Sequence, residues 1–144
     1  MAITSYRDLD VYQRSMKVLV SVHKMALGFL EYERYALADQ MRRASKSVPT
    51  NIAEGYGRRK STKDFKHYLT VALGSANEMI AHLEITRALQ YSQSEACDSL
   101  IEEYTIICKM LYRLIENWRT LPTTSEMAVS KRPVSDLRLP TSDL

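Results

Sequence analysis

The side chains that most often catalyse reactions or bind metals are few in this sequence and poorly spaced for either task. The chain has three histidines and two cysteines among 144 residues. Cys97 and Cys108 lie 11 residues apart, which matches neither a zinc site nor a disulfide framework. Glu78 and His82 are four residues apart, whereas di-metal helical bundles repeat a Glu-x-x-His motif on two helices. We therefore predict no catalytic residues, no metal and no other cofactor.

The segment GYGRRKS, residues 55–61, resembles a phosphate-binding loop only in its composition. It does not follow a strand pattern, and it lacks the spacing of glycine, lysine and hydroxyl residues that a P-loop needs to cradle phosphates. We therefore do not expect it to bind a nucleotide in that way.

Positive charge is concentrated around this segment, although the whole chain has a formal net charge of only +3. Between residues 42 and 66 there are two acidic residues and eight basic ones: Arg42, Arg43, Lys46, Arg58, Arg59, Lys60, Lys63 and Lys66. Cationic side chains and the amides at a helix start suit phosphate oxygens. A nucleic-acid surface is the leading interpretation. The alternatives are docking of an acidic protein, or a solvated face paired with acidic residues of this chain or a neighbour, such as Glu95, Asp98, Glu102 and Glu103.

The elements that position these residues are predicted to be helices. Glycine and proline are scarce, with four of each, and no run alternates apolar and polar residues as a half-buried strand does. Apolar residues recur at steps of three and four in four segments, at about 9–30, 33–56, 61–90 and 94–118. Ser61 and Asp64 have the spacing of a helix cap. We predict an all-α fold, an antiparallel up-down-up-down four-helix bundle.

The predicted bundle occupies residues 1–119, and residues 120–144 read as a flexible tail rich in proline and serine. No apolar stretch approaches the length of about 20 residues that a spanning helix needs. The first residues lack the pattern of a secretory signal. With so few cysteines, we expect a protein of the cytoplasm without membrane contact.

The first predicted helix carries two apolar stripes, one more than a single bundle needs. One stripe, expected to face the core, includes Leu9, Tyr12, Met16, Leu19, Ala26 and Leu30. The second, expected to be the interface of a homo-oligomer, consists of Val11, Val18, Val22, Met25 and Phe29. The alternative is that the tail or a wide core face covers this stripe. In the second predicted helix, Asn51 and Glu54 are polar residues in a segment expected to be buried. We expect them to hydrogen bond to neighbouring helices or subunits.

Three stretches together resemble the small four-helix bundle proteins encoded by intervening sequences within bacterial 23S rRNA genes. They are YRDLDVYQRSMKV, LADQMRRASKSVPTNIAEGYGRRKSTKDFKHYL and ALGSANEMIAHLE. The most specific element runs from RRAS through Pro49 to NIAEG, which ends at Gly55. The resemblance spans about residues 6–118 and does not extend to the segment beyond Arg119.

This family is also similar to the accessory variability determinants (Avd) of diversity-generating retroelements, which form pentameric barrels and bind nucleic acid and a reverse transcriptase. The resemblance implies a non-catalytic homopentamer that binds structured RNA or an RNA/DNA hybrid as an accessory partner of a reverse transcriptase. The alternative is a protein-interaction adaptor with no direct nucleic-acid contact.

Overall fold

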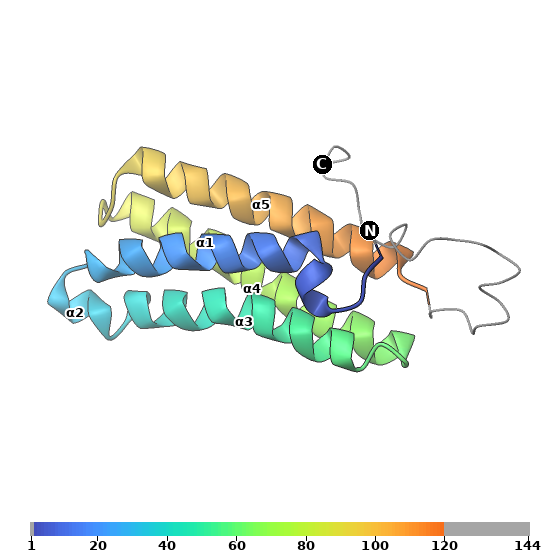
Figure 1. Ribbon diagram of the computed structural model, residues 1–144. Coiled ribbons are helices and arrows are strands. Elements are labelled where there is room, and N and C mark those ends of the chain that lie inside the picture. The colour runs from blue at the N-terminus through green and yellow to red at the C-terminus, as the bar shows by residue number, and fades with distance from the viewer. Residues whose placement is uncertain (1, 120–144) are drawn as a thin grey trace, which may run out of the picture.

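The computed structural model of the protein describes residues 2–119, and these residues form helices and no strand. Four long helices lie lengthwise beside one another (Figure 1). They are α1 (Asp10–Leu27), α3 (Leu37–Gly57), α4 (Thr62–Ala88) and α5 (Ser94–Asn117). A short 3-10 turn, η1 (Tyr6–Asp8), precedes α1, and a one-turn helix, α2 (Glu31–Arg34), precedes α3. The all-helical prediction is confirmed, whereas the predicted tail at 120–144 lies outside the described residues.

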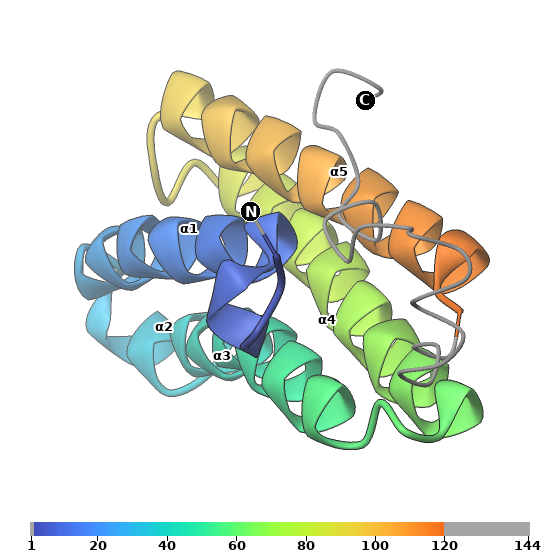
Figure 2. The same ribbon diagram turned by 45° about the vertical axis from the view of Figure 1, so that its right-hand side comes forward.

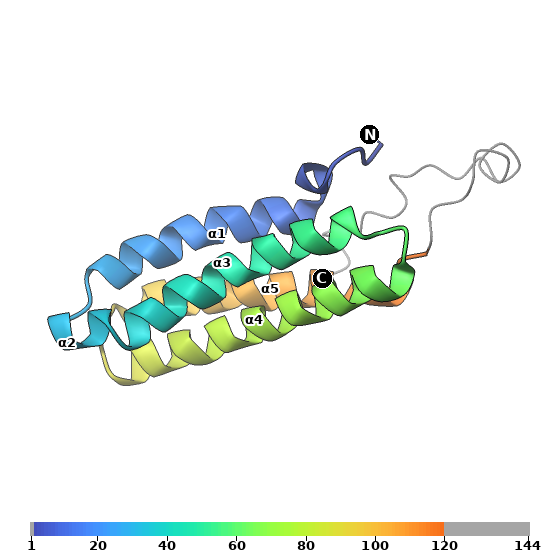
Figure 3. The same cartoon turned by 90° about the horizontal axis from the view of Figure 1, so that it is seen from below.

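Neighbouring helices pack in the order α1, α3, α4 and α5 around the bundle, and α5 closes back onto α1. Figures 1 and 3 show the turn between α3 and α4 at one end, and α2 with the turn between α4 and α5 at the other. The contact of α1 with α5 is the lightest of the four. Figure 2 shows the reason, since α1 runs at an angle to α5.

The start of α4 follows the predicted cap. The Ser61 hydroxyl accepts a hydrogen bond from the Asp64 amide at 3.1 Å, and Ser61 has an extended backbone. Such a cap satisfies one of the amides that a helix start leaves unpaired. The short turn before Ser61 is thereby fixed at the end of the bundle.

The prediction of one helix over about 33–56 is wrong at its start, because α2 and α3 are separate helices there. Ala36 leaves the helical conformation with φ −114° and ψ −94°, which separates α2 from α3. The Glu33 carboxylate accepts a hydrogen bond from the Leu37 amide at 3.3 Å and so caps α3 from outside. The Tyr91 hydroxyl donates to the other oxygen of Glu33 at 3.0 Å. One glutamate therefore joins α2, α3 and the turn that follows α4.

The core is made by one face of each long helix and is closed at one end by Trp118, which is 1% exposed. The Trp118 and Phe65 rings pack nearly perpendicular to each other, with ring centroids 4.5 Å apart. Aromatic pairs of this geometry add about 0.5–1.5 kcal/mol to the effect of burial. Phe65 follows the Ser61 cap by one turn, so this contact holds the start of α4 against the end of α5.

The prediction for the second stripe of α1 is wrong, and the prediction for the first holds only in part. Of the first stripe, Leu9 and Ala26 are buried in the core and Tyr12 packs against it, whereas Met16 and Leu30 are exposed. The residues predicted to be an oligomer interface, Val11, Val18, Val22 and Phe29, are buried in the core, and Met25 is half-buried against it. The fully buried Ser15 and Ala26 complete this line at helical spacing. Their small side chains let α1 approach the bundle closely. The apolar side chains left exposed are Met16, Val20, Leu27 and Leu30.

Candidate functional site

The structure divides the eight predicted basic residues into two groups. The turn cluster, at the end of the bundle where α3 turns into α4 (Figures 1 and 3), consists of Arg58, Arg59, Lys60, Lys63 and Lys66. The α3 group consists of Arg42, Arg43 and Lys46. Lys46 is the member of the α3 group nearest to the turn cluster in sequence. Because a helix rises about 1.5 Å per residue, the backbone of Lys46 lies about 18 Å from that of Arg58 along the axis of α3. The predicted patch is therefore two separate surfaces.

The α3 group is partly neutralised within its own helix. Asp39 lies 3.1 Å from the Arg43 guanidinium and 3.8 Å from that of Arg42. Lys46 is exposed. Exposed ion pairs of this kind add little stability, but they reduce the positive field of the group.

The two arginines of the turn cluster are held in place by contacts to nearby side chains. Arg58 Nε donates to Glu54 at 3.0 Å, and the guanidinium carbon lies 5.3 Å from the ring centroid of Tyr68. The hydrogen bond to Glu54 is the main cause that raises the pKa of Arg58. Arg59 lies over Tyr56, 4.1 Å from the ring centroid, and donates to the Tyr56 carbonyl at 3.0 Å. Both guanidinium groups are thus held in place by neighbouring side chains and backbone.

The lysines of the turn cluster have a different environment. Lys60 and Lys63 are exposed and Lys66 is half-buried, and none of the three has an ion pair within residues 2–119. Lys60 and Lys63 flank the start of α4, where the helix dipole disfavours positive charge by about 0.3–1 kcal/mol. Lys60 and Lys63 therefore do not stabilise the start of α4. An anion bound at this end would interact favourably with both.

The acidic residues in the first half of α5 lie far from the turn cluster. Glu103 lies 3.5 Å from Arg14, and Asp98 pairs with Arg87. Residues 94–103 form the half of α5 at the opposite end of the bundle from the turn cluster (Figure 1). The four acidic residues named from the sequence, Glu95, Asp98, Glu102 and Glu103, therefore do not pair with the turn cluster within the chain.

The motif that ends at Gly55 has a packing role beside the turn cluster. A Cβ atom on Gly55 would lie 2.8 Å from the Cβ atom of Tyr68, so only glycine lets α3 and α4 come this close. Asn51 donates to the Ser47 hydroxyl at 3.0 Å, and the Ser75 hydroxyl of α4 lies 2.8 Å from the same oxygen. Asn51 therefore bonds within its own helix, and Ser47 makes the link to α4. Glu54 does not reach another helix either. It is half exposed and pairs with Arg58 one turn later.

Aromatic side chains near the turn cluster offer little surface for stacking on bases. Tyr56 is 5% exposed and Phe65 is fully buried. Tyr68 is half-buried beneath the Arg58 guanidinium. The turn cluster therefore presents charge and hydrogen-bond donors.

Histidines and acidic residues do not gather into a metal site in the described part of the chain. Within residues 2–119, no three His, Cys, Asp or Glu side chains are placed to hold one ion. His82 is buried, and its Nε2 lies 3.0 Å from a Glu78 carboxylate oxygen. His23 Nδ1 lies 2.9 Å from the Leu19 carbonyl of the same helix. Each of these two histidines thus has a local partner.

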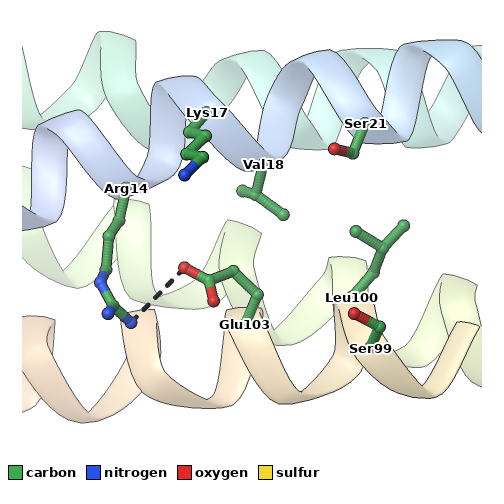
Figure 4. Close-up of a pocket in the computed structure, with 7 residues that line it drawn as sticks. All are labelled: Arg14, Lys17, Val18, Ser21, Ser99, Leu100 and Glu103. Atoms are coloured by element: carbon green, nitrogen blue, oxygen red, sulfur yellow. Dashed lines mark ion pairs between the residues drawn. The ribbon is translucent and has the colours of Figure 1, made fainter. Parts of the chain in front are cut away.

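Two hollows that sequence reasoning missed lie between helices. The first has a volume of about 310 Å³ and lies along the light contact of α1 with α5. In Figure 4 the Arg14 side chain reaches Glu103 across this hollow, with Ser21 and Ser99 farther along it. The second, of about 620 Å³, lies between α4 and α5. No motif marks either one, because each combines residues of two helices whose pairing the sequence does not state.

Comparison with known proteins places the chain in a family. The sequence model described as 23S rRNA-intervening sequence protein matches residues 7–113, a range that contains both the turn cluster and Gly55. The chain belongs to this family. No curated protein matches the chain. Among residues 2–119, no helix combines the length and apolar character needed to cross a membrane.

A solved structure is similar in sequence and fold to this member of the 23S rRNA-intervening sequence protein family. It is a protein of unknown function from the S23 ribosomal protein family of Bacteroides thetaiotaomicron VPI-5482. The two chains are 27% identical with a TM-score of 0.68, over 74% of this chain and 99% of the other. The likeness supports the helical bundle and leaves the function to be argued from the residues.

Proposed function

We propose that this protein is a non-catalytic helical scaffold without a cofactor that binds nucleic acid, either structured RNA or an RNA/DNA hybrid, through the turn cluster. The observation that carries the proposal is the pair of exposed lysines, Lys60 and Lys63, which have no ion pair within residues 2–119 and lie at a helix start that disfavours them. Five basic residues and two acidic ones, Glu54 and Asp64, lie between residues 54 and 66. This end therefore carries a local excess of positive charge.

Binding at this surface is expected to follow the phosphate backbone. The fixed guanidinium groups of Arg58 and Arg59 suit phosphate oxygens, and the mobile ammonium groups of the lysines add unspecific attraction. Contacts to phosphates position a nucleic acid without reading its bases. We therefore expect the turn cluster to bind many sequences with similar affinity.

We further propose that the protein self-associates, with the pentamer implied by the Avd resemblance as the expected assembly. The exposed face of α1, formed by Met16, Val20 and Leu27, supplies the apolar surface for this contact, with exposed fractions of 41%, 49% and 72%. Repetition of the turn cluster by symmetry would strengthen binding through avidity. Light scattering tests this directly, since a pentamer has five times the 16.6 kDa mass of one chain.

The similarity to Avd proteins makes a reverse transcriptase the expected protein partner, and co-purification of the two proteins tests this.

The cytoplasm is the expected location of the protein. Cys97 and Cys108 are free thiols, which suits the reducing conditions of the cytoplasm.

The test of nucleic-acid binding is a salt series. A labelled RNA hairpin is titrated with the protein, and fluorescence anisotropy gives the affinity between about 50 and 200 mM salt. If about three phosphates are neutralised per subunit, the affinity falls by about 40-fold over this range. A change smaller than about threefold, or no binding at low salt, would contradict the proposal.

One observation favours the adaptor as a second candidate function. Large apolar side chains are exposed at the end of the bundle opposite the turn cluster, with Tyr32 at 65% and Tyr35 at 85% exposed. Exposed apolar surface of this kind is typical of protein contacts. A pull-down after exhaustive nuclease treatment separates the two functions, because an adaptor keeps its partner when the nucleic acid is gone.

A further inference from the structure

The hollow between α4 and α5 has a chemical character that the turn cluster lacks. We call it the α4–α5 groove. Its volume of about 620 Å³ lies within the range of about 300–1,000 Å³ typical of small-ligand sites. Its lining combines apolar, aromatic, amide and cationic side chains: Leu73, Asn77, Cys108, Lys109, Tyr112 and Arg113.

Tyr112 gives the α4–α5 groove an aromatic surface for a planar ligand. The side chain is 59% exposed and has no ring contact within residues 2–119. Leu73, which is half-buried against the core, provides apolar surface in the same groove. Lys109 is exposed and lines the groove with Tyr112. An aromatic ring beside a cation matches a ligand that is both planar and anionic.

Asn77 adds a polar group that can orient such a ligand. The Cys108 thiol donates to Asn77 Oδ1 at 3.6 Å. Burial raises the pKa of Cys108 to about 11, so the thiol keeps the proton that it donates at neutral pH. The amide nitrogen of Asn77 has no hydrogen-bond partner within residues 2–119. It is a donor for a carbonyl or ring nitrogen of a ligand.

The α4–α5 groove continues from the turn cluster along one face of α4. Lys66, Thr70, Leu73 and Asn77 recur at steps of four, three and four residues, which places them on the same side of the helix. Lys66 and Leu73 are separated by about 10 Å along the helix axis. About three stacked nucleotides, at about 3.4 Å each, cover that distance.

We propose that the α4–α5 groove binds an unpaired base of the nucleic acid whose phosphates contact the turn cluster, with the base stacked on Tyr112. The proposal rests on the proposed function and adds a ligand class, an unpaired stretch such as the loop of a structured RNA. Lys109 contacts a flanking phosphate, and Asn77 donates to the base edge. Bases within a duplex are already stacked and cannot lie on Tyr112, whereas loops and bulges present them splayed outward.

The experiment compares two single-stranded RNAs of the same length and charge, about eight nucleotides long, one with bases and one abasic. We expect the wild-type protein to bind the RNA with bases about tenfold more tightly, because a base can stack on the Tyr112 ring and an abasic sugar cannot. Tyr112→Ala removes this preference and leaves the salt dependence unchanged. Tyr112→Phe, which keeps the ring, retains the preference.

Tyr35→Ala is the matched control, since Tyr35 is 85% exposed and belongs to the connection between α2 and α3 at the other end of the bundle. Tyr35→Ala is expected to leave the affinities for the RNA with bases and for the abasic RNA unchanged. Equal binding of the two RNAs by the wild type, or a preference that survives in Tyr112→Ala, would overturn base binding in the groove. Phosphate binding by the turn cluster would be unaffected by that result. The absence of salt-dependent binding to both RNAs overturns the groove and the turn cluster together.

Discussion

Gly55 of α3 faces Tyr68 of α4 at a distance that no other residue allows. A Cβ atom on Gly55 would lie 2.8 Å from the Tyr68 Cβ atom and 3.3 Å from the backbone oxygen of Phe65. Both of those atoms are held by the α4 backbone, so rotation of a side chain cannot relieve the contact. The closeness of the two helices beside the turn cluster therefore depends on this glycine.

We predict that Gly55→Ala lowers the free energy of unfolding by about 1–2 kcal/mol. Overpacking of a core costs about 1–3 kcal/mol, and the better helix propensity of alanine returns up to about 1 kcal/mol. Urea unfolding followed by the fluorescence of Trp118, the single tryptophan of the chain, measures the difference.

Gly74→Ala is the control for this prediction. Gly74 is also helical, but a Cβ atom there would meet nothing within 4 Å. The substitution is expected to raise the free energy of unfolding by about 0.5–1 kcal/mol through helix propensity alone. Equal effects of the two substitutions would show that Gly55 has no packing role.

The backbone conformation just after α4 suits glycine better than the glutamine that occupies it. Gln90 has φ of 59°, in the left-handed region, and the Tyr91 amide donates to the Thr86 carbonyl at 3.0 Å, as in a Schellman motif. We predict that Gln90→Gly raises the free energy of unfolding by about 0.5–1 kcal/mol, because glycine adopts this conformation without strain. Thermal unfolding by circular dichroism measures the change. A lower melting temperature would contradict the prediction.

Charges placed on the two sides of α1 are predicted to have different consequences. Val22 is fully buried, so Val22→Glu places a carboxylate in the core and unfolds the protein. Val20 is 49% exposed, and Val20→Glu is expected to keep the helical circular dichroism while light scattering reports a smaller assembly. An unchanged mass for folded Val20→Glu would place the contact between subunits elsewhere.

The positions of the long helices could be predicted from the sequence, because apolar spacing and local caps act within one segment. Ser61 capped α4 as its spacing to Asp64 indicated. The break at Ala36 could not be predicted in the same way. It involves Glu33, whose carboxylate accepts from the Leu37 amide through one oxygen and from the Tyr91 hydroxyl of a distant turn through the other.

The burial of the second α1 stripe could not be predicted, because the apolar residues on the two sides of the helix are similar in size and number. Ser15, a small polar residue, interrupts the stripe that is buried, yet it is fully buried and bonds to the Tyr12 carbonyl at 2.8 Å. Composition therefore favoured the wrong side. The turn cluster could be predicted from the concentration of basic residues in the sequence. Its separation from the α3 group could not, because that depends on the length of α3.

The most direct measurement of the central claim compares two double variants with equal loss of charge. Lys60→Gln with Lys63→Gln removes two positive charges from the turn cluster without breaking an ion pair within residues 2–119, whereas Arg43→Gln with Lys46→Gln removes two from the α3 group. Fluorescence anisotropy with one RNA hairpin across a salt series gives affinity and its salt dependence for both.

The account predicts that the turn-cluster variant binds at least tenfold more weakly, with a salt slope lower by about one for each lysine removed. The α3 variant is predicted to bind within about threefold of the wild type. Equal losses in both variants, or a greater loss in the α3 variant, would contradict the assignment of nucleic-acid binding to the turn cluster.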